Sequence, residues 1–233
     1  MDAQQRALAQ KIYLYLAALF ITSLVVSNLI FQKFFYWYPL GWELFGSPLF
    51  ELSVGILPYP ITFLITDLIS EIYGKKKANT VVIAGIFASF FSMGILWLSN
   101  VVPALPNSPI DNATFSKVFS LSPIAVLASM LAYLSAQFID IKIYHFWKNL
   151  TQGRLLWLRN NFSTFSSQFI DTFLVISLLS LFGVLKWEYF WGLVLSGFVF
   201  KVLIAALDTP ILYLLVSIFR KKFQLKINEE IDF

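Results

Sequence analysis

The sequence predicts an all-α fold: a polytopic membrane bundle of about six transmembrane helices, with both termini in the cytoplasm. Hydrophobic residues make up 58% of the 233 residues, charged residues only 13%, and the mean hydropathy is +0.75. A water-soluble domain is closer to half apolar and a quarter charged. Apolar stretches of about 20 residues, enough to cross the hydrocarbon core as a helix, recur along the chain. The basic residues gather on alternate connections between these stretches.

The apolar stretches define the spans in chain order. They cover residues 12–31, 52–73, 81–102, 121–146, 162–185 and 189–219. The first is too long for a signal-peptide core and lacks a small-x-small cleavage site, so we expect a retained anchor. Pro58 and Pro60 interrupt the second. The sixth exceeds one upright crossing, which predicts a tilt, an extension into the cytoplasm or a break near Pro210. No linker divides the chain, so we expect one membrane domain over residues 1–233.

The distribution of Lys and Arg supports this count and orients the bundle. Six spans place both termini and two connections on one side of the membrane. Thirteen of the 17 basic residues fall on that side: Arg6, Lys11, Lys75, Lys76, Lys77, Lys142, Lys148, Arg154, Arg159, Arg220, Lys221, Lys222 and Lys226. Only Lys33, Lys117 and Lys186 fall on the other, and Lys201 lies inside the last span. This positive-inside bias predicts cytoplasmic termini.

Composition also limits the chemistry and the partners. The chain has no cysteine, which excludes disulfides, thiol chemistry and zinc–thiolate sites. The net charge of +4 follows the topology, so we expect no nucleic-acid partner. No metal and no cofactor is expected. The expected partners are the lipid bilayer, a small-molecule substrate and, as an open alternative, a second copy in a homodimer. Residues 34–48, rich in aromatics with Pro and Gly, form either an interfacial belt or a lid.

Polar side chains inside the spans are the candidate functional residues, because burying a charged one costs about 2.5–3.5 kcal/mol on insertion scales. Asp67 and Glu71 are four residues apart and therefore share one face of a helix. Lys201 and Asp208, seven apart, share a face of the last span. Asn28 in the first span is a weaker candidate.

A six-residue pattern, Ser-x-Gln-Phe-Ile-Asp, occurs in both the fourth and the fifth span. It ends at Asp140 in one and at Asp171 in the other. In each copy the glutamine, Gln137 or Gln168, lies three residues before the aspartate and shares its face. Six positions with one mismatch argue against coincidence.

The depth of the acids adds a constraint. All five carboxylates are expected in the cytoplasmic half of the membrane, Asp171 among them near the inner start of the fifth span. They cannot all be ionised and dry, so they are protonated or face water, a cation or a polar ligand. Single residues have simpler explanations: Glu71 and Asp140 as solvated groups near the interface, or Lys201 as the counter-ion of Asp208. Taken together, the group indicates a binding site.

The same segments resemble the queuosine precursor transporter family (the VUT family). The resemblance rests on residues 59–76, YPITFLITDLISEIYGKK, which contain Tyr59, Asp67 and Glu71. It rests further on the Ser-Gln-x-x-Asp-Thr pattern of 167–172, on Lys201 followed by Asp-Thr-Pro at 208–210, and on Asn28 with the Gln-Lys pair at 32–33.

The resemblance implies a six-helix bacterial inner-membrane importer, not an enzyme. Its substrates would be 7-deazaguanine bases, the 7-cyano and 7-aminomethyl precursors of the tRNA nucleoside queuosine. Asp171, Gln168 and Asp67 would then read the base, because a carboxylate accepts from two neighbouring N–H groups of a guanine-like edge. Lys201 with Asp208 would form a supporting or gating pair, and Tyr59 an aromatic wall. Acidic residues would favour the cationic aminomethyl base.

Two alternatives from other classes remain open at this point. A substrate-capture subunit of a vitamin or nucleobase importer, working with a separate ATP-driven motor, has a similar size and number of spans. An intramembrane aspartyl protease would need two paired aspartates such as Asp140 and Asp171. The single histidine, His145, has no accompanying catalytic pattern, and the sequence contains no P-loop.

Overall fold

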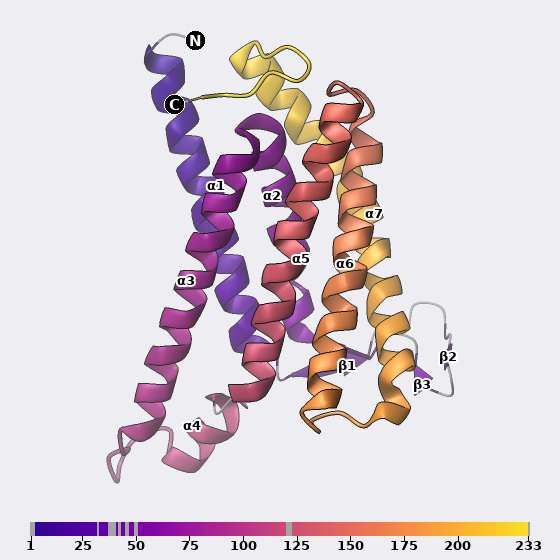
Figure 1. The fold of residues 1–233 in the computed structure, drawn as a ribbon. Helices are drawn as coiled ribbons and strands as arrows, with labels where there is room; N and C mark the ends of the chain where they lie inside the picture. Colours follow the sequence, from indigo (N-terminus) through magenta and orange to yellow (C-terminus); the bar gives the residue numbers. More distant parts are fainter. Residues whose placement is uncertain are drawn as a thin grey trace.

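Long helices run side by side as an elongated bundle, with both termini at one end (Figure 1). The computed structural model describes residues 3–31, 33–36, 41, 43–44, 47–48, 51–119 and 123–232. Within these residues six helices are long and apolar enough to cross a membrane, which confirms the predicted number of spans.

Most helices extend beyond the predicted spans. They are α1 (Ala3–Ile30), α2 (Tyr59–Ile72), α3 (Gly74–Val101), α5 (Pro123–Leu150), α6 (Leu156–Leu181) and α7 (Phe190–Phe223), with the short α4 (Asn112–Phe119) at the end opposite the termini. Two 3-10 turns, η1 (Val54–Ile56) and η2 (Trp187–Tyr189), precede α2 and α7. Hydropathy detects the apolar middle of a helix, whereas the hydrogen-bonded helix continues into its polar ends.

The last span is one continuous helix. α7 has 34 residues and continues through Pro210. The predicted alternative of a break at this proline is therefore wrong. At about 1.5 Å per residue such a helix is about 50 Å long, well beyond a hydrocarbon core of about 30 Å. The helix therefore extends past the core, as one of the predicted alternatives required.

α2 is the central helix of the bundle. It packs against α1, α3, α5 and α7. Within its most apolar window 61% of residues are buried, against 22% for α1, α3 and α7, whose outer faces are apolar and exposed. Polar residues on α2 are therefore directed into protein rather than lipid.

The second span is interrupted near its start, at the prolines, as predicted: the turn η1 ends before them and α2 begins at Tyr59. Pro58 caps α2 and Pro60 lies in its first turn, where a missing N–H costs nothing. The preceding turn η1 is held against the end of α1: the Ser27 hydroxyl donates to the Gly55 carbonyl (2.5 Å), and the Ser53 hydroxyl donates to the Phe31 carbonyl. This contact brings the first residue of α2 into the interior.

Gly55 allows that close approach, and we expect Gly55→Ala to destabilise the protein. An added Cβ would lie 2.7 Å from the Ser27 carbonyl oxygen and 2.8 Å from the Phe31 Cβ. Overpacking of this kind costs about 1–3 kcal/mol. Gly94→Ala on α3 is the matched control, because nothing lies within 4 Å of its added Cβ and alanine favours a helix by about 0.5–1 kcal/mol. Thermal unfolding midpoints in detergent should fall for the first variant only; equal midpoints would contradict the packing argument.

Two short antiparallel pairs add strands to the predicted all-α fold. β1 (Phe34–Tyr36) pairs with β4 (Glu51–Ser53), and β2 (Glu43–Leu44) pairs with β3 (Ser47–Pro48). They belong to the aromatic segment predicted as a belt or a lid. Residues 37–40, 42, 45–46 and 49–50 lie outside the described residues, so the choice between belt and lid stays a prediction.

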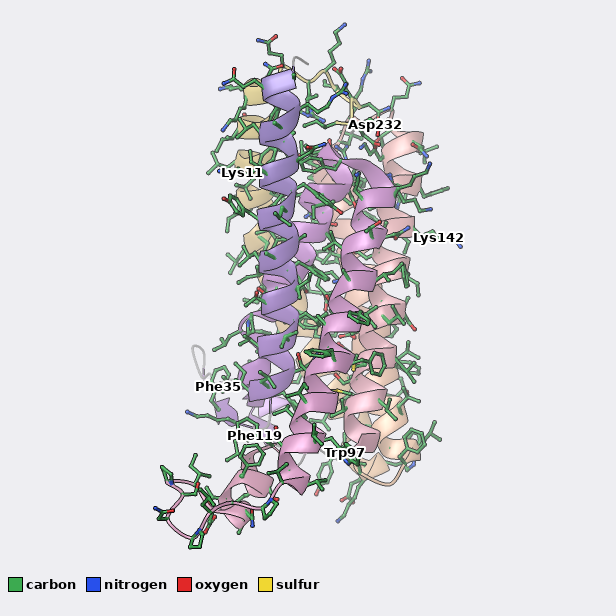
Figure 2. The ribbon with its side chains drawn as sticks, turned by 90° about the vertical axis from the view of Figure 1, so that its left-hand side faces the viewer. Lys11, Phe35, Trp97, Phe119, Lys142 and Asp232 are labelled. Atoms are coloured by element: carbon green, nitrogen blue, oxygen red, sulfur yellow. The ribbon has the colours of Figure 1, made fainter. Side chains whose placement is uncertain are left out.

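Three charged and three aromatic side chains mark the two ends of the bundle. Figure 2 shows Lys11, Lys142 and Asp232 toward the end that holds the termini, with Phe35, Trp97 and Phe119 toward the other. The polarity fits the predicted positive-inside arrangement. Which end faces the cytoplasm stays a prediction.

Candidate functional site

All six spans contribute to an internal cavity of about 230 Å³. Its lining includes the end of α1, the start of α2 and the end of α6, so it lies in the half of the bundle away from the termini. Its principal polar groups belong to Asn28, Tyr59, Ser89, Tyr133, Asp171 and Lys201. Pockets for drug-sized ligands usually span about 300–1,000 Å³, so this cavity suits a smaller solute.

Asp171 is the centre of the cavity's charged wall. Its Oδ2 accepts hydrogen bonds from the Tyr59 hydroxyl (2.5 Å) and from the Lys201 ammonium (2.5 Å). The ammonium also lies 4.8 Å from the centre of the Tyr59 ring. Among the described residues both bonds go to Oδ2, which leaves Oδ1 available to a ligand. Three helices therefore meet in one buried ion pair that faces the cavity.

The partner of Lys201 differs from the prediction. Spacing along α7 suggested Asp208, but the ion pair joins Lys201 to Asp171. Asp208 instead lines a second cavity of about 20 Å³ together with Gln168, and this cavity shares Tyr59 and Lys201 with the larger one. Spacing within one helix identifies a common face but does not say which neighbouring helix that face meets.

Asp171 also lies deeper in the bundle than predicted. The prediction placed it near the inner start of its span because hydropathy began that span at residue 162. α6 begins at Leu156, so Asp171 is past its midpoint, level with Tyr59 at the start of α2. The polar first turns of α6, including the buried Arg159 and Asn160, hid the true start of the helix.

Asp67 and Asp140 form a second polar cluster, between α2 and α5. Both side chains are buried, and each carboxyl group accepts a hydrogen bond from a side chain of α6. Ser167 donates to Asp140 Oδ1 (2.9 Å), and Thr164 donates to Asp67 Oδ2 (3.4 Å). Neither aspartate lines the larger cavity. The solvated alternative for Asp140 is wrong, because its side chain is fully buried.

Gln137 bonds to Tyr133, a cavity residue that was not among the predicted site residues. Its amide Nε2 donates to the Tyr133 hydroxyl (2.8 Å), and Tyr133 lines the cavity. Tyr133 lies four residues before Gln137 and seven before Asp140, on one face of α5. This spacing could have identified Tyr133 as a candidate from the sequence.

Glu71 lies at the centre of a buried ionic network near the termini. Arg159 donates to both carboxylate oxygens (2.7 and 3.2 Å), and Arg220 donates to Oε1 (2.5 Å). The Tyr144 hydroxyl donates to Oε2 (3.0 Å), and the Lys148 ammonium lies 3.9 Å from the same oxygen. Glu71 is therefore neither solvated nor on the cavity, and it joins four helices at the end of the bundle that holds the termini.

The C-terminal segment, residues 225–232, covers this network. The Ile231 N–H donates to the Ile72 carbonyl at the end of α2 (2.7 Å), and the Ile231 side chain is buried. Glu230 pairs with Lys148 (2.7 Å). Gly74, in the left-handed region (φ +82°), lies directly against Glu230, where a Cβ would clash. This end of the bundle is closed by ion pairs and by the chain's own tail.

The fold and this cavity define a class: a multi-pass membrane protein with a cavity among its spans that carries a few polar groups, the general form of a small-solute transporter. Residues 53–215 match the family described as "Putative vitamin uptake transporter", and the chain belongs to that family. The family consists of transporters and not enzymes, so the protease alternative is wrong.

A relative from Bacillus subtilis (strain 168), named "Probable queuosine precursor transporter", is 27% identical over 172 residues, which cover 73% of each chain. The resemblance seen in the sequence is thus confirmed at the level of the family. No solved structure matches the chain.

Proposed function

We propose that this protein imports 7-deazaguanine precursors of queuosine across the bacterial inner membrane, where they feed tRNA modification. The substrate would bind in the larger cavity against Asp171. The observation that carries the proposal is the buried carboxylate whose Oδ2 is held by Tyr59 and Lys201 while Oδ1 remains available. A family of uptake transporters and a relative named for queuosine precursors support the substrate class.

The chemistry of the cavity suits a flat heterocycle with adjacent N–H donors. Asp171 accepts from such an edge, and a carboxylate bonds more strongly than a neutral acceptor. The Tyr59 ring, with Tyr133 edge-on at 5.5 Å, forms an aromatic wall. Asn28 offers an amide that both donates and accepts. Under this proposal Asp67 and Gln168 do not contact the base, because neither lines this cavity.

The remaining predicted residues have other roles in this proposal. With the termini in the cytoplasm, the larger cavity lies in the outer half of the membrane and receives substrate from outside. Gln168 and Asp208, on the adjoining small cavity, then lie on the route inward. The Glu71 network and the C-terminal segment form the closed inner end, which has to open for release.

The proposal is tested by restoring queuosine to tRNA. A bacterial host unable to make or import the precursors would express this chain and receive nanomolar 7-cyano- or 7-aminomethyl-deazaguanine. We expect queuosine in tRNA only when the chain is expressed. No restoration, with the protein shown to be in the membrane, would overturn the substrate assignment and leave the six-span fold standing.

The capture-subunit alternative predicts a different result with purified protein. A stand-alone carrier should take up the base in proteoliposomes that contain no other protein. Uptake that appears only with an added ATPase would favour the capture subunit.

A further inference from the structure

The charges on the larger cavity balance one another. Among its described lining residues, the charged ones are Asp171 and Lys201, and they are paired with each other. The other acids predicted for the site lie elsewhere: Asp67 and Asp140 against hydroxyls of α6, Glu71 among its cations, and Asp208 on the adjoining small cavity. The acid-rich pocket that would favour a cationic substrate is therefore not the cavity that the fold builds.

The wall opposite Asp171 carries a hydroxyl with no partner. Ser89 on α3 is only 2% exposed, and its Oγ has no hydrogen-bond partner among the described residues. The nearby hydroxyls of Ser27 and Ser53 are already bonded to backbone carbonyls. An orphaned buried hydroxyl on a cavity wall is costly unless a ligand satisfies it.

Ser89 and Asp171 approach the cavity from opposite sides. α3 packs on α1, α2 and α5, whereas α6 packs on α5 and α7. Figure 1 shows α3 on one side of the bundle and α6 with α7 on the other. Apolar side chains of Leu24, Ile86 and Met130 also line the cavity. The second pole of the site is thus apolar with a neutral hydrogen-bonding group.

A deazaguanine spans these two poles. Its N–H edge and its 7-substituent lie at opposite ends of the bicyclic ring, so an edge bound at Asp171 directs the substituent toward Ser89. We infer that Ser89 reads the 7-substituent, and that the cavity selects a neutral base whose substituent accepts a hydrogen bond over one carrying an ammonium group. This inference rests on the proposed function and narrows its substrate to the 7-cyano base.

The expected preference for the cyano base follows from the different cost of burying a neutral and a charged substituent near Ser89. The Ser89 hydroxyl donates to a nitrile nitrogen, which satisfies both partners. An ammonium group would lose its hydration with no unpaired carboxylate to replace it. We expect the neutral base to bind about tenfold more tightly, because the hydrogen bond to Ser89 contributes several-fold and the lost hydration of the ammonium group weakens the other base further.

The test is competition for uptake in the precursor-deficient host. Initial uptake of labelled 7-cyano-7-deazaguanine would be measured against increasing unlabelled cyano or aminomethyl base. In the wild type the aminomethyl base should compete about tenfold more weakly. Ser89→Ala should weaken the cyano base several-fold and leave competition by the aminomethyl base unchanged. Ser99→Ala is the matched control, because Ser99 is exposed on the same helix and bonds to Ile95.

Each outcome bears on a separate statement. Equal or stronger competition by the aminomethyl base overturns this inference and leaves the proposed function standing. A Ser89→Ala variant that takes up the cyano base like the wild type, or that weakens both bases equally, overturns the role of Ser89. Uptake of neither base, with the protein in the membrane, overturns the proposed function together with the inference.

Discussion

Uptake of deazaguanine should be lost when Asp171 is replaced by alanine, while the protein still inserts into the membrane. The change removes the carboxylate proposed to bind the base and the anchor of Tyr59 and Lys201. Removing one member of a buried charged hydrogen bond costs about 2–5 kcal/mol in binding, which corresponds to at least about a thirtyfold loss of affinity. Queuosine in tRNA is the readout, with membrane protein quantified in parallel.

Two further variants separate binding from folding. Asp171→Asn keeps the shape of the side chain and its acceptor oxygen, so it should insert normally and still transport poorly, because the charge is gone. Glu188→Ala removes an exposed acid that is paired only with Lys186 at the far end of the bundle, and should transport like the wild type. Normal uptake by Asp171→Ala would remove Asp171 from the site.

Glu71→Gln should have the largest effect on stability. Arg159 is fully buried, and its guanidinium makes two bonds to this carboxylate. The neutral amide leaves that charge without its counter-ion, and breaking a buried pair costs about 3–5 kcal/mol. The thermal unfolding midpoint in detergent should fall on the order of 10 °C.

Glu188→Gln is the matched control for this prediction. Glu188 also forms an ion pair, with Lys186, but both side chains are exposed (58% and 79%). An exposed pair contributes less than about 1 kcal/mol, so its midpoint should change by a few degrees at most. A similar fall of the unfolding midpoint in both variants would mean that the stabilisation by Glu71 does not depend on its burial.

Part of the candidate site could be predicted from residue type alone. Asp171, Lys201, Tyr59 and Asn28 were chosen because polar groups inside spans are costly or because they matched a family pattern, and all four line one cavity. Ser89 was missed because a single serine in an apolar helix commonly bonds to its own backbone, as Ser99 does. Only the tertiary structure shows that the Ser89 hydroxyl has no hydrogen-bond partner among the described residues.

Pairings between helices could not be predicted. Lys201 was assigned to Asp208, its neighbour on the same face, and Glu71 was grouped with the site. The helix rotations and depths that bring Lys201 to Asp171, and Arg159 to Glu71, depend on packing between segments about 30 and 88 residues apart.

The sequence by itself determined that the chain crosses the membrane six times, because the length and apolarity of a span must match the bilayer. It also determined which side chains are costly to place inside a membrane. Only the tertiary structure decided how those side chains divide among a cavity, a buried polar cluster and an ionic network. Hydropathy measures each residue against lipid, whereas the division depends on which buried charges meet across helices.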